Sequence, residues 1–477
     1  MTDGSAGHTP EHDPALAKRV LAIASAATFV AFLDVTIVNV AFPSLHDDFS
    51  DSSLSLISWV VSAYAISFAA LLTPAGRIAD VVGRREIFLG GFALFIAASG
   101  LCAIAPSVEA LIAMRVLQGA GAAMMIPAGL GLILAVTAPE RRTAAIGAWG
   151  AATSLAAVAG PAVGGVLVEV SDWRAVFAVN VPIGLAVIAI GLRQLPSIEP
   201  VEHRLPDLLG TGLLIAGFSG IAVALTEAGE WGWGDTATLA FGLSGLALLA
   251  LSLRRAASHP APALAISLWR ERDYAIANAA MLFFGAMLFA WLLVGILFLT
   301  GVWGYSVLEA GLASTPGAFT SAVAAAVAGR LTATRGPAVV VVTGAALLVV
   351  SGVWFLAVVD ETPNFLGLWL PAGAVLGLGF GSISVGLTSA AAQALPPERF
   401  AAGVGLSMTA RQLGGALGIA VLATILSSSD PGLPGMRAVY WFCIGATVVT
   451  ALIAATLGRP ARAPAPGAAS APAEARS

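Results

Sequence analysis

The feature that most constrains this chain is a succession of apolar stretches, each about 20 residues long, separated by short polar segments. A helix of about 20 apolar residues crosses the hydrocarbon core of a bilayer. The 477 residues are 58% hydrophobic and 10% charged, whereas soluble domains are roughly 25% charged. A single soluble core does not become this large and this apolar. We therefore predict an all-α integral membrane protein.

The apolar stretches predict fourteen membrane-spanning helices, which places both termini on one side. The first stretch is too long for the apolar region of a signal peptide, so we expect it to remain as a span. The predicted spans are residues 20–42, 56–75, 86–105, 109–135, 143–168, 175–193, 207–226, 237–253, 275–300, 308–328, 338–358, 366–390, 400–427 and 438–457.

The basic residues indicate which side is cytoplasmic, because Lys and Arg accumulate in cytoplasmic loops. Of the 23 basic residues, Arg174 and Arg437 fall in segments on one side, and Arg115 and Arg411 fall within spans. All the others lie on the side of the termini. Both termini are therefore predicted to be cytoplasmic. A wrong span count would destroy this alternation, so the bias also supports the count.

The chain contains an internal repeat. Gly76-Arg77 and Gly83 match Gly329-Arg330 and Gly336 in spacing, and Pro139-Glu140-Arg141 matches Pro397-Glu398-Arg399, with glycines at equal offsets beyond each proline. Such repeats are typical of transporters whose substrate path lies between two halves. The predicted arrangement is six helices, an inserted pair and six helices (6 + 2 + 6). Its boundaries are a tail at 1–17, the N-terminal half at 18–198, the inserted hairpin at 199–256, the C-terminal half with its preceding loop at 257–458, and a tail at 459–477. The preceding loop is predicted to carry a surface helix at 263–269. Both tails are predicted to be disordered from their composition.

Asp34 is the first residue whose chemistry points to function. It lies roughly 20 Å from the inner end of its span, where an ionised carboxylate is costly. Burial favours the neutral acid and a nearby cation favours the ionised one, so the group can take up a proton on one side and release it on the other. A fixed structural hydrogen-bond network, or a role in holding a cationic substrate, is the open alternative. Asn39 lies in the same span and is a further candidate.

Two arginines lie within spans. Arg115 shares a helix face with Gln118, three residues on. Arginine does not carry protons by titration, but it can influence a neighbouring acid. Arg411 lies beside Gln412 and a pair of glycines in a comparable position.

Two further segments are candidates for conformational roles. Residues 76–85, the latch segment, combine spaced glycines with opposed charges, an arrangement suited to holding one of two states; a plain positive-inside loop explains the arginines alone. Residues 160–165 carry a proline flanked by small residues, which suits a kink and close helix packing at a gate; small-residue packing without gating is the alternative. The predicted residues are Gly76, Arg77, Asp80, Gly83, Arg84 and Arg85 in the latch segment, and Gly160, Pro161, Gly164 and Gly165 at the gate.

Several function classes are disfavoured. The sole lysine, Lys18, lies before the first span, so no phosphate-binding loop of the Gly-Lys-Ser/Thr type is present. Zinc-protease and serine-hydrolase motifs are also absent, and no basic stripe suggests nucleic acid. We therefore predict no enzyme, no metal, no cofactor and no nucleic-acid partner.

Residues 33–43, 76–85, 115–121, 160–165 and 173–182 together resemble the major facilitator superfamily, specifically its fourteen-span drug:proton antiporter branch. One departure is Phe42, where leucine is usual. The resemblance covers about residues 18–458. It implies alternating access and proton-driven export of lipophilic, often cationic compounds, including antibiotics, across the cell membrane. It assigns proton coupling to Asp34 and Arg115, and the stabilisation of one conformation to Asp80, Arg84 and Arg85.

Other functions stay open at this point. A proton-coupled or passive transporter of one metabolite is the nearest alternative, and a transport-inactive membrane receptor or scaffold is the alternative from another class. The expected partners are a small-molecule substrate, protons and the lipid bilayer, and the protein is predicted to work as a monomer.

Overall fold

The computed structural model describes residues 13–52, 54–198, 207–262, 266–429 and 432–458, and within these ranges the regular structure is entirely helical. The helices are α1 (Pro14–Asp48), α2 (Leu54–Val82), α3 (Arg84–Ala103), α4 (Val108–Val136), α5 (Arg142–Val170), α6 (Ala175–Ala178), α7 (Asn180–Gln194), α8 (Leu208–Trp231), α9 (Thr236–Ser258), α10 (Arg272–Gly301), α11 (Val307–Arg335), α12 (Pro337–Val358), α13 (Leu370–Gln393), α14 (Phe400–Ser428) and α15 (Leu433–Ala454). Short turns η1 (Pro139–Arg141), η2 (Ile266–Arg270), η3 (Phe365–Trp369) and η4 (Pro397–Arg399) join some of them.

Thirteen helical segments in the described part of the chain are long and apolar enough to cross a membrane, and α6 and α7 together form one of them. This confirms the membrane class. The predicted count of fourteen includes α5, which is 29 residues long but is not among the thirteen. That count therefore stays a prediction.

Several boundaries differ from those expected from the sequence. The first helix extends to Asp48, beyond the predicted end at residue 42, and α8 continues to Trp231. The latch segment was expected to be a loop, but it is helical except at Gly83. Gly83 has a φ of 133°, a conformation that glycine adopts without steric cost. The surface helix expected at residues 263–269 starts outside the described residues, and its second part belongs to η2.

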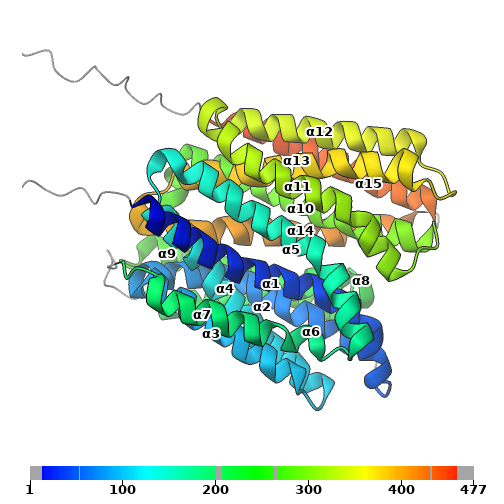
Figure 1. The fold of residues 1–477 in the computed structure, drawn as a ribbon, viewed down its shortest axis with the longest axis horizontal. Coiled ribbons are helices and arrows are strands. Elements are labelled where there is room, and N and C mark those ends of the chain that lie inside the picture. The colour runs from blue at the N-terminus through cyan, green and yellow to red at the C-terminus, as the bar shows by residue number, and fades with distance from the viewer. Residues whose placement is uncertain (1–12, 53, 199–206, 263–265, 430–431, 459–477) are drawn as a thin grey trace, which may run out of the picture.

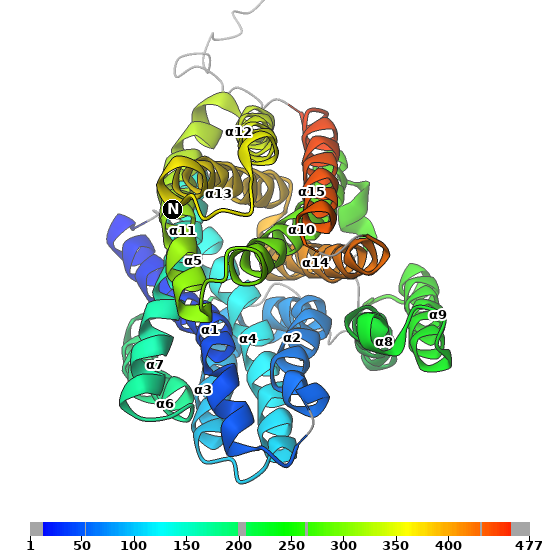
Figure 2. The same ribbon diagram turned by 90° about the vertical axis from the view of Figure 1, so that its right-hand side faces the viewer.

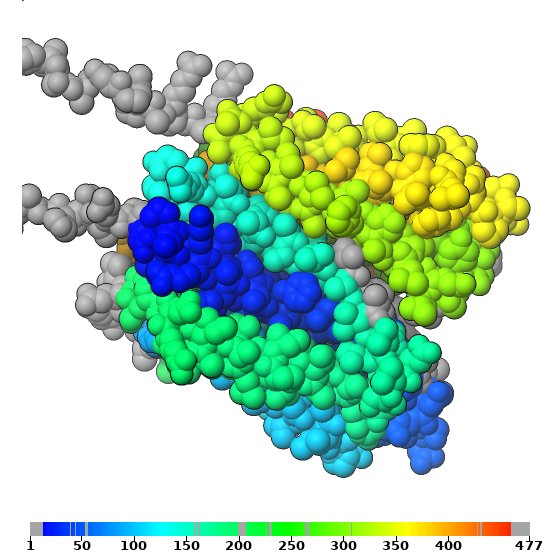
Figure 3. All heavy atoms as spheres, viewed as in Figure 1, coloured from blue at the N-terminus to red at the C-terminus, as the bar shows by residue number. Residues whose placement is uncertain are grey.

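The helices form two bundles with a hairpin beside them. Helices α1–α7 make one bundle and α10–α15 the other (Figure 1). Helices α8 and α9 lie outside both: α8 is next to α2 and α14, and α9 packs on the outer side of α8 (Figure 2). In the space-filling view α1 runs between α7 and α5 on the face turned to the reader (Figure 3). Each bundle is thus built from helices that follow one another in the sequence.

The two bundles meet mainly through two pairs of helices, α2 with α14 and α5 with α11, with further contacts of α4 with α14 and of α5 with α13. Both pairs use glycines as contact points. A side chain at Gly76 would collide with the carbonyl of Ala401, and one at Gly405 with that of Leu72. At the repeat-related positions, Gly329 lies against the carbonyl of Thr143 and Gly147 against that of Ala325. Close backbone approach through small residues is typical of helices packed in a membrane.

These contacts close one end of the molecule, where α2 ends and α14 begins; we call it the closed end. Thr73 and Thr409 also share a hydrogen bond there, with their hydroxyl oxygens 2.9 Å apart. At the other end of the molecule, towards the right of Figure 1, the two bundles spread apart.

Candidate functional site: an intramembrane ion pair and a closed latch

Asp34 lies in the middle of the N-terminal bundle and is fully buried. Arg115 Nη1 donates to its Oδ2 at 2.6 Å. Gln118 Nε2 and Asn180 Nδ2 both donate to its Oδ1, each at 2.9 Å. Three donors from α4 and α7 therefore give both oxygens of the α1 carboxyl group a hydrogen-bond partner, as a buried polar group requires.

Arg115 is held from several sides as well. Its Nη1 also donates to Gln118 Oε1 at 2.7 Å, and its Nε donates to the carbonyl of Val60 in α2 at 3.0 Å. The guanidinium lies 4.3 Å from the ring centroid of Tyr64, a favourable position for a cation over an aromatic face. The two intramembrane charges thus form a direct ion pair, and Gln118, which was expected to share a helix face with Arg115, bonds to both of its members.

Two polar residues of this network were missed by the sequence analysis. Asn180 was expected only as part of an apolar span, yet its Nδ2 bridges Asp34 and the Oγ of Ser99, which lies 3.0 Å away. Ser99 in turn donates to the carbonyl of Phe177 at 2.9 Å. The sequence did contain a signal for Asn180: it is a lone carboxamide in an otherwise apolar span, and such a group needs a hydrogen-bond partner within the protein.

A second buried acid was also missed. Glu227 is 4% exposed near the C-terminal end of α8, one residue beyond the span predicted from the sequence. Apolar periodicity locates the middle of a span better than its ends, and the extra turn brings this residue into the helix. Asp34 is therefore not the only acid buried within a long helix.

The latch segment joins the two bundles at the closed end. Asp80 is buried at the end of α2, where Arg84 Nε donates to its Oδ1 at 2.7 Å. The same carboxylate accepts the backbone N–H groups of Ala401 and Ala402, at 3.2 and 2.8 Å, in the first turn of α14. A carboxylate at a helix N-terminus is stabilised by the unpaired N–H groups and the helix dipole. Asp80 therefore caps a helix of the opposite bundle.

The other latch residues have different partners. Arg84 donates to the carbonyl of Pro397 in the opposite bundle, next to the ring of Phe400. Arg85 turns away from Asp80 and donates to the carbonyl of Leu192 at 2.8 Å. Arg77 is buried. The sequence placed three arginines around Asp80, and the hydrogen bonds of the structure pair it with Arg84.

The predicted gate in α5 packs against α1 and α11. A side chain at Gly160 would collide with Thr36, and one at Gly164 would contact Ile37. Gly165 faces Leu308 of α11. These glycines bring α5 against the stretch of α1 that carries Asp34. The side chains of Pro161 and Asn39 lie outside the described residues.

Arg411 is not part of the ion-pair network. It lies in α14, and its Nε is buried without a hydrogen-bond partner. The sequence analysis named it as a candidate beside Asp34 and Arg115, but it lies in the C-terminal bundle and has no hydrogen bond to either of them.

The described residues contain no cluster of three or more His, Cys, Asp or Glu side chains able to hold a metal ion. Cys102 and Cys443 are free and buried in different bundles.

Comparison with known proteins shows which family this chain belongs to. The family model of the Major Facilitator Superfamily matches residues 24–260 and 278–477. The tetracenomycin C resistance and export protein of Streptomyces glaucescens is 32% identical over 414 residues, 86% of this chain and 76% of that protein. The cephamycin export protein CmcT of Amycolatopsis lactamdurans is 33% identical over 432 residues, 89% of this chain and 88% of that protein.

A solved structure shows the same fold at lower identity. The human organic anion transporter MFSD10 superposes with a TM-score of 0.67 at 16% identity, covering 93% of this chain and 100% of that one. At this identity the likeness speaks for the fold alone. The extent of the family match and the identity to the two export proteins establish that the chain is a multi-pass membrane transporter of the major facilitator superfamily.

Proposed function

We propose that this protein exports small lipophilic organic compounds in exchange for protons by alternating access, with Asp34 as the proton site. The observation that carries the proposal is the fully buried Asp34–Arg115 pair with its two carboxamide donors. The export proteins among the relatives support the direction of transport.

The proposed topology has fourteen spans arranged 6 + 2 + 6 in the cell membrane, with both termini cytoplasmic, and the protein works as a monomer. The asymmetry of the basic residues supports this orientation. In this orientation the closed end faces the cytoplasm, so the conformation described here is the one that bars access from that side.

Protonation of Asp34 would change the network in a defined way. The ionised carboxylate accepts from three donors, and Arg115 Nη1 is only 2.6 Å from its Oδ2. A proton on Oδ2 would face this guanidinium donor and remove the charge that balances it, so the pair would separate. Gly160 and Gly164 hold α1 against α5, which links such a movement to the contact between the bundles.

The latch is the second moving part. While Asp80 caps α14, the cytoplasmic ends of the bundles stay together; opening requires that the N–H groups of Ala401 and Ala402 lose this carboxylate. The latch therefore favours the outward-facing state, and protonation of Asp34 in that state would shift the equilibrium away from it. Release of this proton and binding of substrate on the cytoplasmic side would shift the equilibrium back.

The energy available is sufficient for export. One charge moved through 100 mV yields about 2.3 kcal/mol, and one pH unit adds roughly 1.4 kcal/mol. One proton therefore supports a substrate gradient of roughly 400-fold.

The test uses everted membrane vesicles that contain the full chain, an imposed ΔpH and a panel of lipophilic compounds. For the wild type we expect a compound that accumulates in the vesicles and dissipates ΔpH as it does so. Asp34→Asn should abolish both effects and retain exchange of labelled compound at equilibrium, which shows that the fold and the substrate site survive.

Asp48→Asn is the matched control, because it removes an exposed carboxylate from the end of the same helix. It should behave like the wild type. Accumulation against a gradient together with ΔpH dissipation in Asp34→Asn would refute the coupling role, and a panel in which no compound moves protons would refute antiport.

A further inference from the structure

Asn180 uses only one end of its carboxamide in the network around Asp34. The side chain is fully buried. Its Nδ2 donates both to Asp34 Oδ1, at 2.9 Å, and to Ser99 Oγ, at 3.0 Å, whereas its Oδ1 is buried without a hydrogen-bond partner. A buried acceptor without a partner costs free energy, unless another protonation state of the network supplies the missing donor.

A proton on Asp34 would need such an acceptor. Of the three side chains that donate to this carboxyl group, Arg115 has only donors. The Oε1 of Gln118 already accepts from Arg115 Nη1 at 2.7 Å and lies 3.9 Å from the Sγ of Cys102. The Oδ1 of Asn180 is therefore the one unoccupied acceptor among these three side chains, and it belongs to a residue that contacts Asp34 Oδ1.

The ionisable groups around Asp34 do not compete for this proton. Arg115 of α4 stays charged. Tyr64 of α2 and Cys102 of α3 also interact with Asp34 electrostatically, but a buried phenol and a buried thiol stay neutral at physiological pH. Helix α5 presents the glycines of the predicted gate to this part of α1. Helix α6 contains no ionisable side chain, and α7 contains only Arg193, near its end.

We propose that Asn180 is a positioning residue that serves both protonation states of Asp34: its Nδ2 donates to the ionised carboxylate, and its Oδ1, after a half turn of the carboxamide, accepts the proton of the neutral acid. The rotation exchanges the two ends of one planar group, so the backbone need not move. While Asp34 is ionised, the rotation would place one oxygen against another, so only a proton on Asp34 Oδ1 favours it. The inference rests on the proposed function, since it takes Asp34 as the proton site.

The rotation would also reach the break between α6 and α7. Ser99 accepts from Asn180 Nδ2 and donates to the carbonyl of Phe177 at 2.9 Å. With an oxygen in place of Nδ2, the Ser99 hydroxyl would donate to Asn180 instead, and the carbonyl of Phe177 would lose this bond. That carbonyl lies at the end of α6, and Pro182, which has no backbone N–H, lies in the first turn of α7. Protonation of Asp34 would thus loosen this span where its helix is already interrupted.

The first test is infrared difference spectroscopy of the full chain in nanodiscs of phosphatidylcholine, stepped between acidic and alkaline buffer. The side-chain carbonyls of asparagine are labelled with carbon-13, and the chain has four asparagines, so the labelled band has few components. The signal of protonated Asp34 is the one that disappears in Asp34→Asn. We expect an asparagine carbonyl band to shift together with this signal, because that carbonyl gains a hydrogen bond, and we expect Asn180→Leu to lose the shift. An asparagine band that stays constant while Asp34 titrates would overturn the proposal.

Transport separates this role from a structural one. In everted vesicles, Asn180→Leu should lower ΔpH-driven accumulation of the compound about tenfold or more, the range for a hydrogen bond to a charged group. It should retain exchange of labelled compound at equilibrium, which does not require Asp34 to change its protonation. Asn180→Thr should recover part of the accumulation, because a hydroxyl can both donate and accept.

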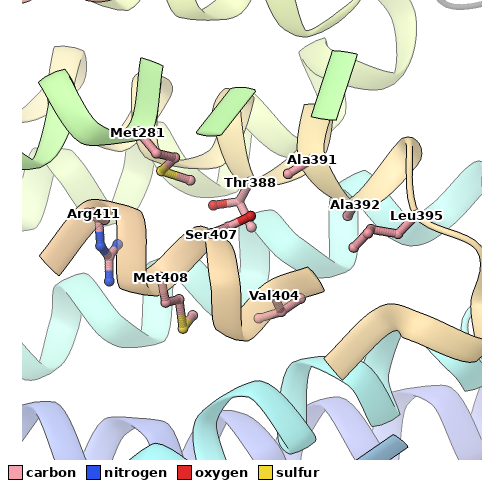
Figure 4. A pocket seen from close by; sticks show the side chains of 9 residues that line it. All are labelled: Met281, Thr388, Ala391, Ala392, Leu395, Val404, Ser407, Met408 and Arg411. Carbon is pink, nitrogen blue, oxygen red and sulfur yellow. The ribbon is translucent and has the colours of Figure 1, made fainter. Parts of the chain in front are cut away.

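Asn278→Leu is the matched control, because it removes a carboxamide that is only 1% exposed from α10 of the other bundle. Asn278 lies one turn before Met281, which lines a small cavity between α10, α13 and α14, and the residues lining this cavity include no acid (Figure 4). This variant should accumulate the compound like the wild type. A loss equal to that of Asn180→Leu would mean that any buried carboxamide is needed, and would overturn the proposal.

Failure of this inference differs from failure of the proposed function. Coupled export in Asp34→Asn would refute the proposed function, whatever Asn180 does. If Asp34→Asn abolishes coupling but Asn180→Leu accumulates the compound like the wild type, Asp34 remains the proton site and the role of Asn180 is refuted. If Asn180→Leu does not fold, the labelled carbonyl band of the wild type decides the question.

Discussion

The two bundles differ in how the charges within their helices are paired. In the N-terminal bundle, Asp34 and Arg115 neutralise each other at 2.6 Å, and the carboxamides of Gln118 and Asn180 complete the carboxylate's hydrogen bonds. In the C-terminal bundle, Arg411 has no such partner among the described residues. The two repeated halves therefore share their helical arrangement but differ in the charged side chains within their helices.

The same contrast occurs at the closed end. Asp80 of the N-terminal half caps the first turn of α14, whereas the repeat-related position of the C-terminal half is Ala333. The two glycine contacts are preserved in both halves, but only one half adds a carboxylate. The difference indicates that the two halves share their packing but not their charges. The N-terminal half carries Asp34 and Asp80, each paired with an arginine, whereas the C-terminal half carries Arg411 without an acidic partner among the described residues.

The largest effect should come from breaking the balanced pair. Arg115→Leu leaves Asp34 buried without its cation, and removing one partner of a buried pair costs about 3–5 kcal/mol. Arg411→Leu removes a cation that has no protein partner, so its effect on the unliganded protein should be small or stabilising. Thermal unfolding of both purified variants measures the difference.

A double variant separates loss of the pair from loss of volume. Asp34→Asn combined with Arg115→Gln removes both charges and should recover much of the stability lost in Arg115→Leu. If Arg411→Leu destabilised the protein as strongly as Arg115→Leu does, Arg411 would have a partner within the fold and the contrast between the bundles would be wrong.

The sequence was sufficient for the framework of this contrast because membrane burial leaves a strong local signal. Apolar length predicts the helices, the repeated glycine and Pro-Glu-Arg motifs predict the two halves, and the spacing of Arg115 and Gln118 predicts that they share a face. The contact of Asp34 with Asn180, 146 residues away, has no local signature, because it depends on how α1 and α7 pack.

The functions of the three latch arginines were also beyond local reasoning. Arg77, Arg84 and Arg85 look equivalent in sequence, yet Arg84 bonds to Asp80 while Arg85 bonds to the carbonyl of Leu192. Their directions follow from the helical geometry at residues 76–82 and from the single non-helical residue Gly83, where a loop had been expected.

The next largest effect should come from removing Asp80, the carboxylate that caps α14 at the closed end. Asp80→Ala removes the acceptor for two backbone N–H groups of α14 and for Arg84, which should shift the equilibrium towards the state open at this end by about 1–3 kcal/mol. A cysteine introduced at Thr73, whose hydroxyl contacts Thr409, should become more reactive towards a water-soluble thiol reagent. The native cysteines are buried and give a low background. An unchanged labelling rate would mean that Asp80 does not hold this end closed.

A smaller effect is expected from giving the C-terminal half a carboxylate at the position that the repeat relates to Asp80. Ala333→Asp should place a carboxylate near the first turn of α5, as Asp80 does for α14, because Gly329 already lies against Thr143. A carboxylate at an exposed helix N-terminus contributes about 0.3–1 kcal/mol, so labelling at residue 73 should slow modestly. Ala333→Asn, which lacks the charge, is the control. Faster labelling in the aspartate variant would show that the halves do not meet in an equivalent way there.

The smallest effect should come from an exposed ion pair, which separates the role of burial from that of charge. Asp48 accepts from Trp173 Nε1 at 3.0 Å and from Arg174 Nη1 at 2.9 Å, and the bond from Trp173, followed by that from Arg174, lowers the pKa of this carboxyl. The stabilisation is therefore present above the ordinary pKa of aspartate, about 4, and is lost as the pH falls through the lowered value. Because both side chains are more than a third exposed, solvent screening limits the effect of Asp48→Asn to less than about 1 kcal/mol.

Thermal unfolding of Asp48→Asn at neutral pH should show this small loss of stability, and the variant and the wild type should converge below about pH 4. A loss comparable to that of Arg115→Leu would mean that charge pairing itself, irrespective of burial, stabilises the N-terminal bundle.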